Sequence, residues 1–328
     1  MPTIRDVASR AKVSTATVSH VMNGTRPVAE ATRARVYAAM KDLQFQPSGF
    51  ARGLRQQTLK TIGLILGDFS DPFYSQIFQG VEAVAKNHGF AVMIASSDED
   101  PENEYAGMQL MIQKGLNGVV IAPCPADDAV RDYIEAVGFP VVLIDRTWPN
   151  ASVPSVLLHN REAAAMLVNL FVERGHRRIL FVEGRPGLTT TAERREGYVE
   201  AMRSHDLIPL ILPGGSVVQG GHDASAWWLA HQDAASAVIC GNNLMLMGFL
   251  EGLKQTTQPA RPVVLAGVDN ERWSGLVTPG VSVVEQPARA MGEEAARLLI
   301  RRIQEGHGVP EITRFAGRLV ARDASEGM

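Results

Sequence analysis

Ten polar and aromatic side chains stand where expected strands end or where the following helices begin. They are Asp68, Phe73, Tyr74, Asp145, Arg146, Arg194, Asn242, Asp269, Trp273 and Gln286. In open α/β sheets, ligands bind beyond the carboxyl ends of the strands. Carboxylates accept hydrogen bonds from hydroxyl groups, arginine donates several, amides do both, and aromatic faces cover a ring. This set therefore indicates a binding site for a polyol, with Trp273 as a lid.

Other interpretations stay open for part of this set. Phe73 or Tyr74, taken alone, is a typical core residue. Asp145 could instead form an ion pair or cap a strand, and an Arg–Asp ion pair between the two lobes, without a ligand, is a further alternative. The residue types alone do not decide between these roles.

The sequence contains no pattern typical of catalysis. A G-x-S-x-G elbow, an H-E-x-x-H pair, a P-loop and a G-x-G-x-x-G turn after a strand are all absent. The His and acidic residues show no metal-ligand spacing. We therefore expect no catalytic residue, no metal and no cofactor.

Apolar strands alternate with helices from residue 61 onwards. The expected strands are 61–67, 90–96, 118–122, 140–144, 155–158, 178–182, 209–212, 236–240, 262–267 and 281–284. Helices lie between most of them, including 73–88, 102–114, 161–174, 191–204, 242–254 and 287–305. This alternation predicts doubly wound parallel sheets, and the strands are too many for one ordinary sheet. We predict two lobes, 59–158 plus 287–312 and 160–284 plus 313–328.

Positive charge is concentrated at the N-terminus. Residues 1–60 hold ten Lys or Arg and three acids, a charge of +7. Because the whole chain has a net charge of −3, the remaining residues carry −10. A basic head on an acidic body indicates a polyanionic partner for the head. A solvated charged face is the alternative.

Residues 3–45 read as three short helices within a domain of residues 1–47. Thr3 and Asp6 have capping-box spacing, and apolar residues recur at helical intervals. Residues 48–58 form a separate short helix whose two glycines, Gly49 and Gly53, lower its helicity, so it needs a partner to be stable.

The composition predicts a cytoplasmic protein. The N-terminus lacks the apolar core of a secretory signal, and no stretch approaches a membrane span. Cys124 and Cys240 cannot form a disulfide framework, so we expect two buried thiols in a reducing compartment.

The first 60 residues resemble the LacI/GalR family of bacterial regulators. The similarity is carried by TIRDVASRAKVSTATVSHVMNGTRPVAEATRARV and by FQPSGFARGLR, and it continues through IGLILGDFSDPFYSQIFQGVE and PVVLIDR. Within the family, the purine and ribose repressors are the members that this chain most resembles over this stretch. The resemblance implies a homodimeric repressor that binds a near-palindromic operator and senses a small molecule in a two-lobed body with a cleft, like that of periplasmic sugar-binding proteins.

The resemblance also implies roles in DNA binding. The second helix is the recognition helix, whose first residues enter the major groove. Expected base contacts are Thr15, Ala16, Thr17 and His20. Expected phosphate contacts are Ser14, Ser19, Asn23, Thr32 and Arg33, although Ser14, Thr17 and Asn23 could instead cap helices. Leu54, flanked by Arg52 and Arg55, is expected to enter the minor groove; packing on its own subunit is the alternative.

Departures from the family pattern bear on the effector. This chain has His159-Asn160 and Asn242-Asn243 where the family usually has Asp-Asn and Asn-Asp, and Val217-Val218 where an aromatic is common. Sugar-binding relatives carry an Asp-Arg pair where this chain has Asp145-Arg146, whereas purine-binding relatives carry Asp followed by an aromatic residue. We expect a sugar-like effector; two arginines keep a sugar acid or phosphate as an alternative. Whether it induces or co-represses stays open.

Two functions from other classes fit the sequence less well. A solute-binding protein of a transporter would explain the body but neither the basic head nor the missing signal peptide. A sugar-modifying enzyme would need catalytic motifs that the sequence lacks.

Overall fold

The computed structural model divides into two compact units. Unit 1 comprises Met1–Ser70, Tyr74–Val156 and Arg289–Thr313, and unit 2 comprises Asp71–Phe73, Leu157–Ala288 and Arg314–Met328. The structure describes residues 2–23, 26–43, 45, 60–125, 128–148, 151–255, 262–269, 272–277, 280–306 and 311–322. Among these, no helix is both long and apolar enough to cross a membrane.

Three short helices open the chain. They are α1 (Ile4–Ala11), α2 (Thr15–Asn23) and α3 (Glu30–Asp42). The Thr3 hydroxyl accepts a hydrogen bond from the Asp6 backbone N–H, and the Asp6 carboxylate accepts one from the Thr3 backbone, so the predicted capping box is confirmed. Val7, Val18 and Val36, one from each helix, are completely buried and form the centre of this small core.

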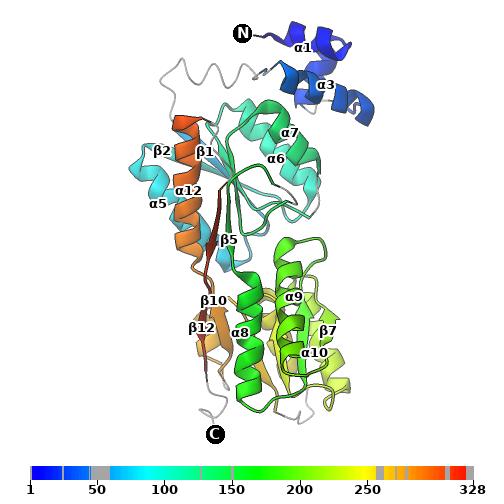
Figure 1. Cartoon of the computed structure of the whole chain (residues 1–328), viewed down its shortest axis with the longest axis vertical. Helices are drawn as coiled ribbons and strands as arrows, with labels where there is room; N and C mark the ends of the chain where they lie inside the picture. The colour runs from blue at the N-terminus through cyan, green and yellow to red at the C-terminus, as the bar shows by residue number, and fades with distance from the viewer. Residues whose placement is uncertain are drawn as a thin grey trace. The chain divides into compact units, whose positions relative to one another are not determined.

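Unit 1 contains a six-stranded sheet in the order β11-β5-β4-β3-β1-β2. Its strands are β1 (Lys60–Leu66), β2 (Phe90–Ser96), β3 (Val119–Ile121), β4 (Val141–Ile144), β5 (Ser155–Leu158) and β11 (Ile312–Phe315). Its helices are α5 (Pro72–Asn87), α6 (Pro101–Gln113), α7 (Asp128–Val137) and α12 (Ala288–Glu305). Helices α5 and α12 pack together on one face of the sheet, and α6 and α7 lie on the other (Figure 1). The pairs from β2 to β5 are parallel, so their carboxyl ends share one edge.

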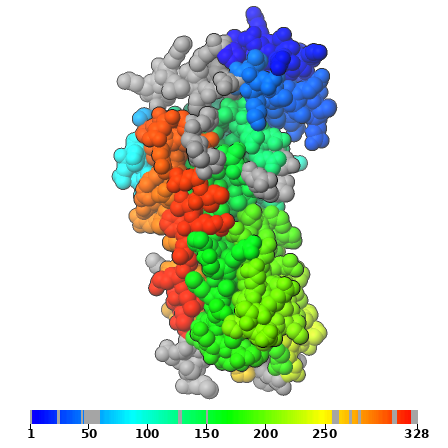
Figure 2. Space-filling model, in the orientation of Figure 1, coloured from blue at the N-terminus to red at the C-terminus, as the bar shows by residue number. Residues whose placement is uncertain are grey.

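Unit 2 repeats this architecture with the order β12-β10-β9-β8-β6-β7. Its strands are β6 (Ile179–Glu183), β7 (Leu210–Pro213), β8 (Ala237–Cys240), β9 (Val264–Val268), β10 (Ser282–Glu285) and β12 (Arg318–Val320). Its helices are α8 (Asn160–Glu173), α9 (Thr189–Ser204), α10 (Val218–Ala230), α11 (Asn243–Lys254) and the single turn η1 (Arg272–Gly275). Helices α8 and α9 pack together, as do α10 and α11. Strand β12, drawn in red, lies beside green α8 on the surface shown in Figure 2.

The predicted α/β class with parallel sheets is confirmed, with two additions. All ten expected strands are present, but β11 and β12 were not among them. Both are short edge strands without a fully buried residue: β11 alternates between exposed and half-buried residues, and β12 has one exposed residue followed by two half-buried ones. They therefore lack the continuous apolar run that marks a strand buried on both faces.

Glycines allow the paired helices of unit 2 to approach closely. A Cβ built on Gly221 of α10 would lie 2.1 Å from the Met245 carbonyl oxygen and 2.7 Å from the Phe249 nitrogen, both backbone atoms of α11. Gly107 of α6 is the opposite case, since the nearest atom to its Cβ would be 3.6 Å away.

We expect Gly221→Ala to lower the free energy of unfolding by about 1–3 kcal/mol, because the two helix backbones must separate. Gly107→Ala, the matched control, should raise it by roughly 0.5–1 kcal/mol, because alanine loses less backbone entropy in a helix. Urea unfolding of both variants measures the two effects. Equal stability of Gly221→Ala and the wild type would contradict the packing described.

Candidate functional site

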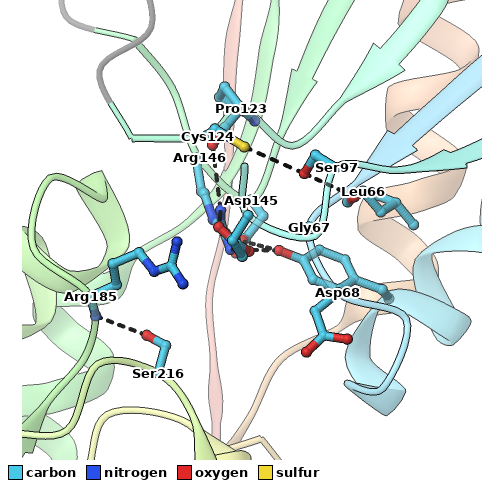
Figure 3. A network of polar contacts seen from close by, with 12 residues as sticks. Leu66, Gly67, Asp68, Ser97, Pro123, Cys124, Asp145, Arg146, Arg185 and Ser216 are labelled. Atoms are coloured by element: carbon cyan, nitrogen blue, oxygen red, sulfur yellow. Dashed lines mark hydrogen bonds and ion pairs between the residues drawn. The ribbon is translucent and has the colours of Figure 1, made fainter. Parts of the chain in front are cut away.

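The guanidinium of Arg146 is held at the carboxyl edge of the unit 1 sheet. Its two terminal nitrogens donate to the two Glu99 carboxylate oxygens at 2.7 and 2.6 Å. They also donate to the Pro123 carbonyl at 3.4 Å and to the Tyr74 hydroxyl at 2.7 Å. Its Nε donates to Asp145 at 3.2 Å. Figure 3 shows Asp145 and Arg146 beside Pro123 in this network.

All five N–H groups of Arg146 thus have a protein acceptor within the described part of unit 1. Burial by itself would lower the pKa of Arg146, but Tyr74, Glu99 and Asp145 outweigh it and raise the pKa further above its usual value. The group therefore stays charged. The sequence predicted Arg146 as a donor to ligand hydroxyls; the structure places it in ion pairs, one of them the alternative considered for Asp145.

Glu99 was missed by the sequence analysis, and unusual backbone brings it to Arg146. Asp98 and Glu99 both have left-handed backbone, with φ of 51° and 57°. A Cβ on Gly67, directly after β1, would lie 2.0 Å from a Glu99 carboxylate oxygen, so the glycine makes room for that carboxylate. The available signal was the position of Glu99, three residues after the carboxyl end of β2.

The corresponding edge of unit 2 holds a second polar cluster. Asp269, which follows β9, has φ of 84° and accepts a hydrogen bond from Gln286 Nε2 at 2.7 Å. Buried Arg194 donates from Nε to Asn160 at 2.8 Å and from a terminal nitrogen to the Gly241 carbonyl at 2.6 Å. Unit 2 therefore groups Asp269 with Gln286, and it places Arg194 at the end of β8.

The remaining predicted ligand residues lie in a helix cap, in a turn or against the core. Asn242 caps α11, accepting from the Met245 N–H at 3.0 Å, and donates to the Ser216 carbonyl at 3.2 Å. Asp68 accepts from the backbone and hydroxyl of Ser70. Phe73 is buried, and Trp273 packs partly buried against the unit 2 core. Ser216 also accepts from the backbone N–H of Arg185, which ties the loops after β6 and β7 together (Figure 3).

Both cysteines are free and buried, as predicted. Burial raises the pKa of the Cys124 and Cys240 thiols, so both are poor nucleophiles. The backbone N–H of Cys124 donates to the buried Glu104 carboxylate at 2.5 Å. Among the described residues, no group of three or more His, Cys, Asp or Glu is arranged to hold a metal ion.

The predicted base-contacting side chains lie on α2, with Thr15, Ala16 and Thr17 in its first turn and His20 in its last. Thr15 and Ala16 are exposed, and Thr17 and His20 are half-buried. The Ser14 hydroxyl accepts from the Thr17 backbone N–H at 3.0 Å, so the capping role considered for Ser14 is realised. Ser19, Thr32 and Arg33 are half-buried. The Asn23 side chain and the hinge residues Leu54, Arg52 and Arg55 lie outside the described residues.

The N-terminal helices contact helices α6 and α7 of unit 1 through aromatic residues. The hydroxyls of Tyr37 and Tyr105 are 2.5 Å apart, and the Tyr37 and Tyr133 ring centroids are separated by 5.8 Å. The Arg33 guanidinium lies 5.9 Å from the Tyr105 ring centroid. Gln109 donates to the carbonyl of Met22, at the end of α2.

A short three-helix domain with exposed residues at the start of α2, followed by two mostly parallel sheets with polar carboxyl edges, is typical of a DNA-binding regulator with a periplasmic-binding-protein-like body. Residues 3–48 match the bacterial regulatory proteins of the lacI family, and residues 59–322 match the periplasmic binding proteins and sugar binding domain of the LacI family. The chain belongs to the LacI family of transcription regulators.

Named relatives agree with this assignment. The chain is 32% identical to the transcriptional repressor PurR of Klebsiella pneumoniae strain 342, over 98% of this chain and 96% of that protein. A complex of the regulator CelR with cellobiose matches with a TM-score of 0.76 and 27% identity, covering 99% of this chain and all of that one. A ribose operon repressor from Burkholderia thailandensis matches with a TM-score of 0.71 and 28% identity, covering 80% and 99%.

Proposed function

We propose that the chain is a cytoplasmic repressor that binds a near-palindromic operator as a homodimer and changes its DNA affinity when a sugar-like effector binds. The observation that carries this is the combination, in one family member, of the exposed first turn of α2 with carboxylate-rich strand ends. The function is binding and regulation, without a catalytic step.

For DNA, we propose that Thr15, Ala16, Thr17 and His20 read base edges. Hydroxyl, methyl and imidazole groups can each discriminate base pairs in the major groove. Ser14, Ser19, Asn23, Thr32 and Arg33 are the proposed phosphate contacts, and Leu54 with Arg52 and Arg55 the proposed minor-groove contacts. A capping role for Ser14 is compatible with this, because the N-terminus of a helix also offers N–H groups to phosphate.

For the effector, the carboxyl edges favour a polyol. Asp269 and Asp145 are buried carboxylates at strand ends, and carboxylates accept hydrogen bonds from hydroxyl groups. The similarity to the CelR regulator in complex with cellobiose and to a ribose operon repressor supports a sugar. A purine is the second candidate, because the PurR repressors are similar over the whole chain.

A thermal-shift screen of the full chain against sugars, sugar acids, sugar phosphates and purines tests the effector. A specific ligand at a hundredfold excess over Kd stabilises the folded state by about 2.7 kcal/mol. We expect a sugar-type ligand to shift the midpoint and then to change operator binding in a gel-shift assay, with the operator selected from random duplexes. Tight binding of guanine or hypoxanthine, with no response to any sugar, would refute the sugar assignment.

Asp269→Asn is expected to weaken binding of the effector found in that screen at least about tenfold. The change replaces an acceptor oxygen with a donor, and hydrogen bonds to charged groups contribute about 1.5–3 kcal/mol. Isothermal titration measures the effect. Asp206→Asn is the matched control, because exposed Asp206 also has left-handed backbone, with φ of 55°. Equal affinities of the two variants would remove Asp269 from the site.

A further inference from the structure

The polar cluster of unit 1, formed by Arg146, Glu99 and Asp145, has a net negative charge although Arg146 itself is positive. Arg146 contributes one positive charge, and its partners Glu99 and Asp145 contribute two negative charges, which leaves the cluster at −1. The Arg146 and Asp145 side chains are only 8% exposed, and that of Glu99 is 15% exposed, so solvent screens these charges weakly.

Arg146 is already bound to a carboxylate in the geometry that it would use for an anionic ligand. The paired contacts at 2.7 and 2.6 Å join both terminal nitrogens to both Glu99 oxygens, the bidentate arrangement in which arginine holds carboxylates and phosphates. An anionic effector would have to displace Glu99 from these nitrogens or approach a cluster of like charge.

We propose that Glu99 is a specificity-determining residue that occupies the anion-binding face of Arg146, so that the effector is a neutral or amino sugar and not a sugar acid or sugar phosphate. This inference rests on the proposed sugar-binding function. Arg146 then acts as a positioning residue: it holds the carboxylates of Asp145 and Glu99 and the Tyr74 hydroxyl in place, and these acceptors receive hydroxyl or ammonium donors from the ligand.

The backbone around Glu99 supports a role beyond packing. Left-handed backbone is unfavourable for residues with a side chain, and here two such residues, Asp98 and Glu99, are consecutive. The conformation is held by neighbours: Ser96 Oγ donates to the Gly67 carbonyl at 3.1 Å and contacts Asp98 Oδ1 at 2.5 Å. Strain that is maintained in this way concentrates at ligand sites.

The test uses the full chain and ligand sets matched in shape. Glucose, glucosamine, glucuronate and glucose 6-phosphate form one set, and ribose with ribose 5-phosphate forms another, each titrated by calorimetry. The wild type should bind a neutral or amino member at least about tenfold more tightly than its anionic counterpart. A second probe is inorganic phosphate alone, which should not shift the wild-type melting midpoint beyond the effect of ionic strength.

Glu99→Gln should reverse this discrimination. Removing the carboxylate leaves Arg146 without its bidentate partner, so the variant should gain a midpoint shift with phosphate, and its preference for neutral ligands should fall at least about tenfold. Glu102→Gln is the matched control, because Glu102 is an exposed carboxylate three residues away. Glu99→Asp, which keeps the charge, should retain the wild-type preference.

Two outcomes would overturn the proposal. One is tighter binding of an anionic sugar than of its neutral counterpart by the wild type, a result that needs no variant to fold. The other is a folded Glu99→Gln variant with unchanged ligand preference and no response to phosphate. Failure of the proposed function gives a different result, namely binding of a purine and of no sugar of either charge.

Discussion

Methionine in place of Arg146 should cost unit 1 about 3–5 kcal/mol of stability, because one partner of a buried ion pair is removed and the other charge stays buried. Glu99 and Asp145 would then be two nearly buried carboxylates at the carboxyl edge of one sheet without the cation between them. Methionine keeps most of the side-chain length, so little of the loss arises from an empty cavity. Urea unfolding followed by circular dichroism measures the change.

Arg289→Met is the matched control for this substitution. Arg289 pairs with Glu293 one helical turn away on α12, but its side chain is 62% exposed, and exposed pairs of this kind contribute only about 0.3–0.5 kcal/mol. The double variant Arg146→Met with Glu99→Gln should be more stable than the sum of the single changes indicates, because it removes one uncompensated charge. A loss below about 1 kcal/mol for Arg146→Met would show that the ion pairs are not the principal role of Arg146.

Combined replacement of Thr15 and His20 by alanine should weaken operator binding by about 2–6 kcal/mol, which is roughly thirtyfold or more. Each side chain is proposed to contact base edges, and a good base contact contributes about 1–3 kcal/mol of discrimination. Both lie on α2 outside its buried positions, so the fold should be unaffected. Binding to an operator selected by the wild type is measured by fluorescence anisotropy at several salt concentrations.

The salt dependence separates base contacts from phosphate contacts. The Thr15→Ala and His20→Ala variant should keep the wild-type slope, whereas Arg33→Ala should weaken binding to all sequences and reduce the slope by about one. Affinity of the double variant within threefold of the wild type would exclude the proposed reading face. Unchanged unfolding midpoints confirm that neither variant acts through stability.

The sequence predicted the elements whose signals are local. The capping box of Thr3 and Asp6 needs residues only three positions apart, and the parallel strands appear as continuous apolar runs because both faces of each sheet are covered. Strands β11 and β12 were not predicted, because neither of these edge strands contains a fully buried residue and so neither shows such a run. The DNA contacts assigned by resemblance, including Leu54, stay predictions.

The amino-acid sequence by itself determined that polar residues would gather at the strand ends, because the carboxyl ends of parallel strands share one edge. Only the tertiary structure decided which of them pair. Glu99 and Arg146 are 47 positions apart and follow different strands, so no periodicity relates them. Their pairing depends on strand order, on the left-handed backbone at Glu99 and on the missing side chain at Gly67. From the sequence alone, Arg146 is therefore predicted to bind a ligand, whereas in the folded chain its guanidinium is paired with the Glu99 carboxylate.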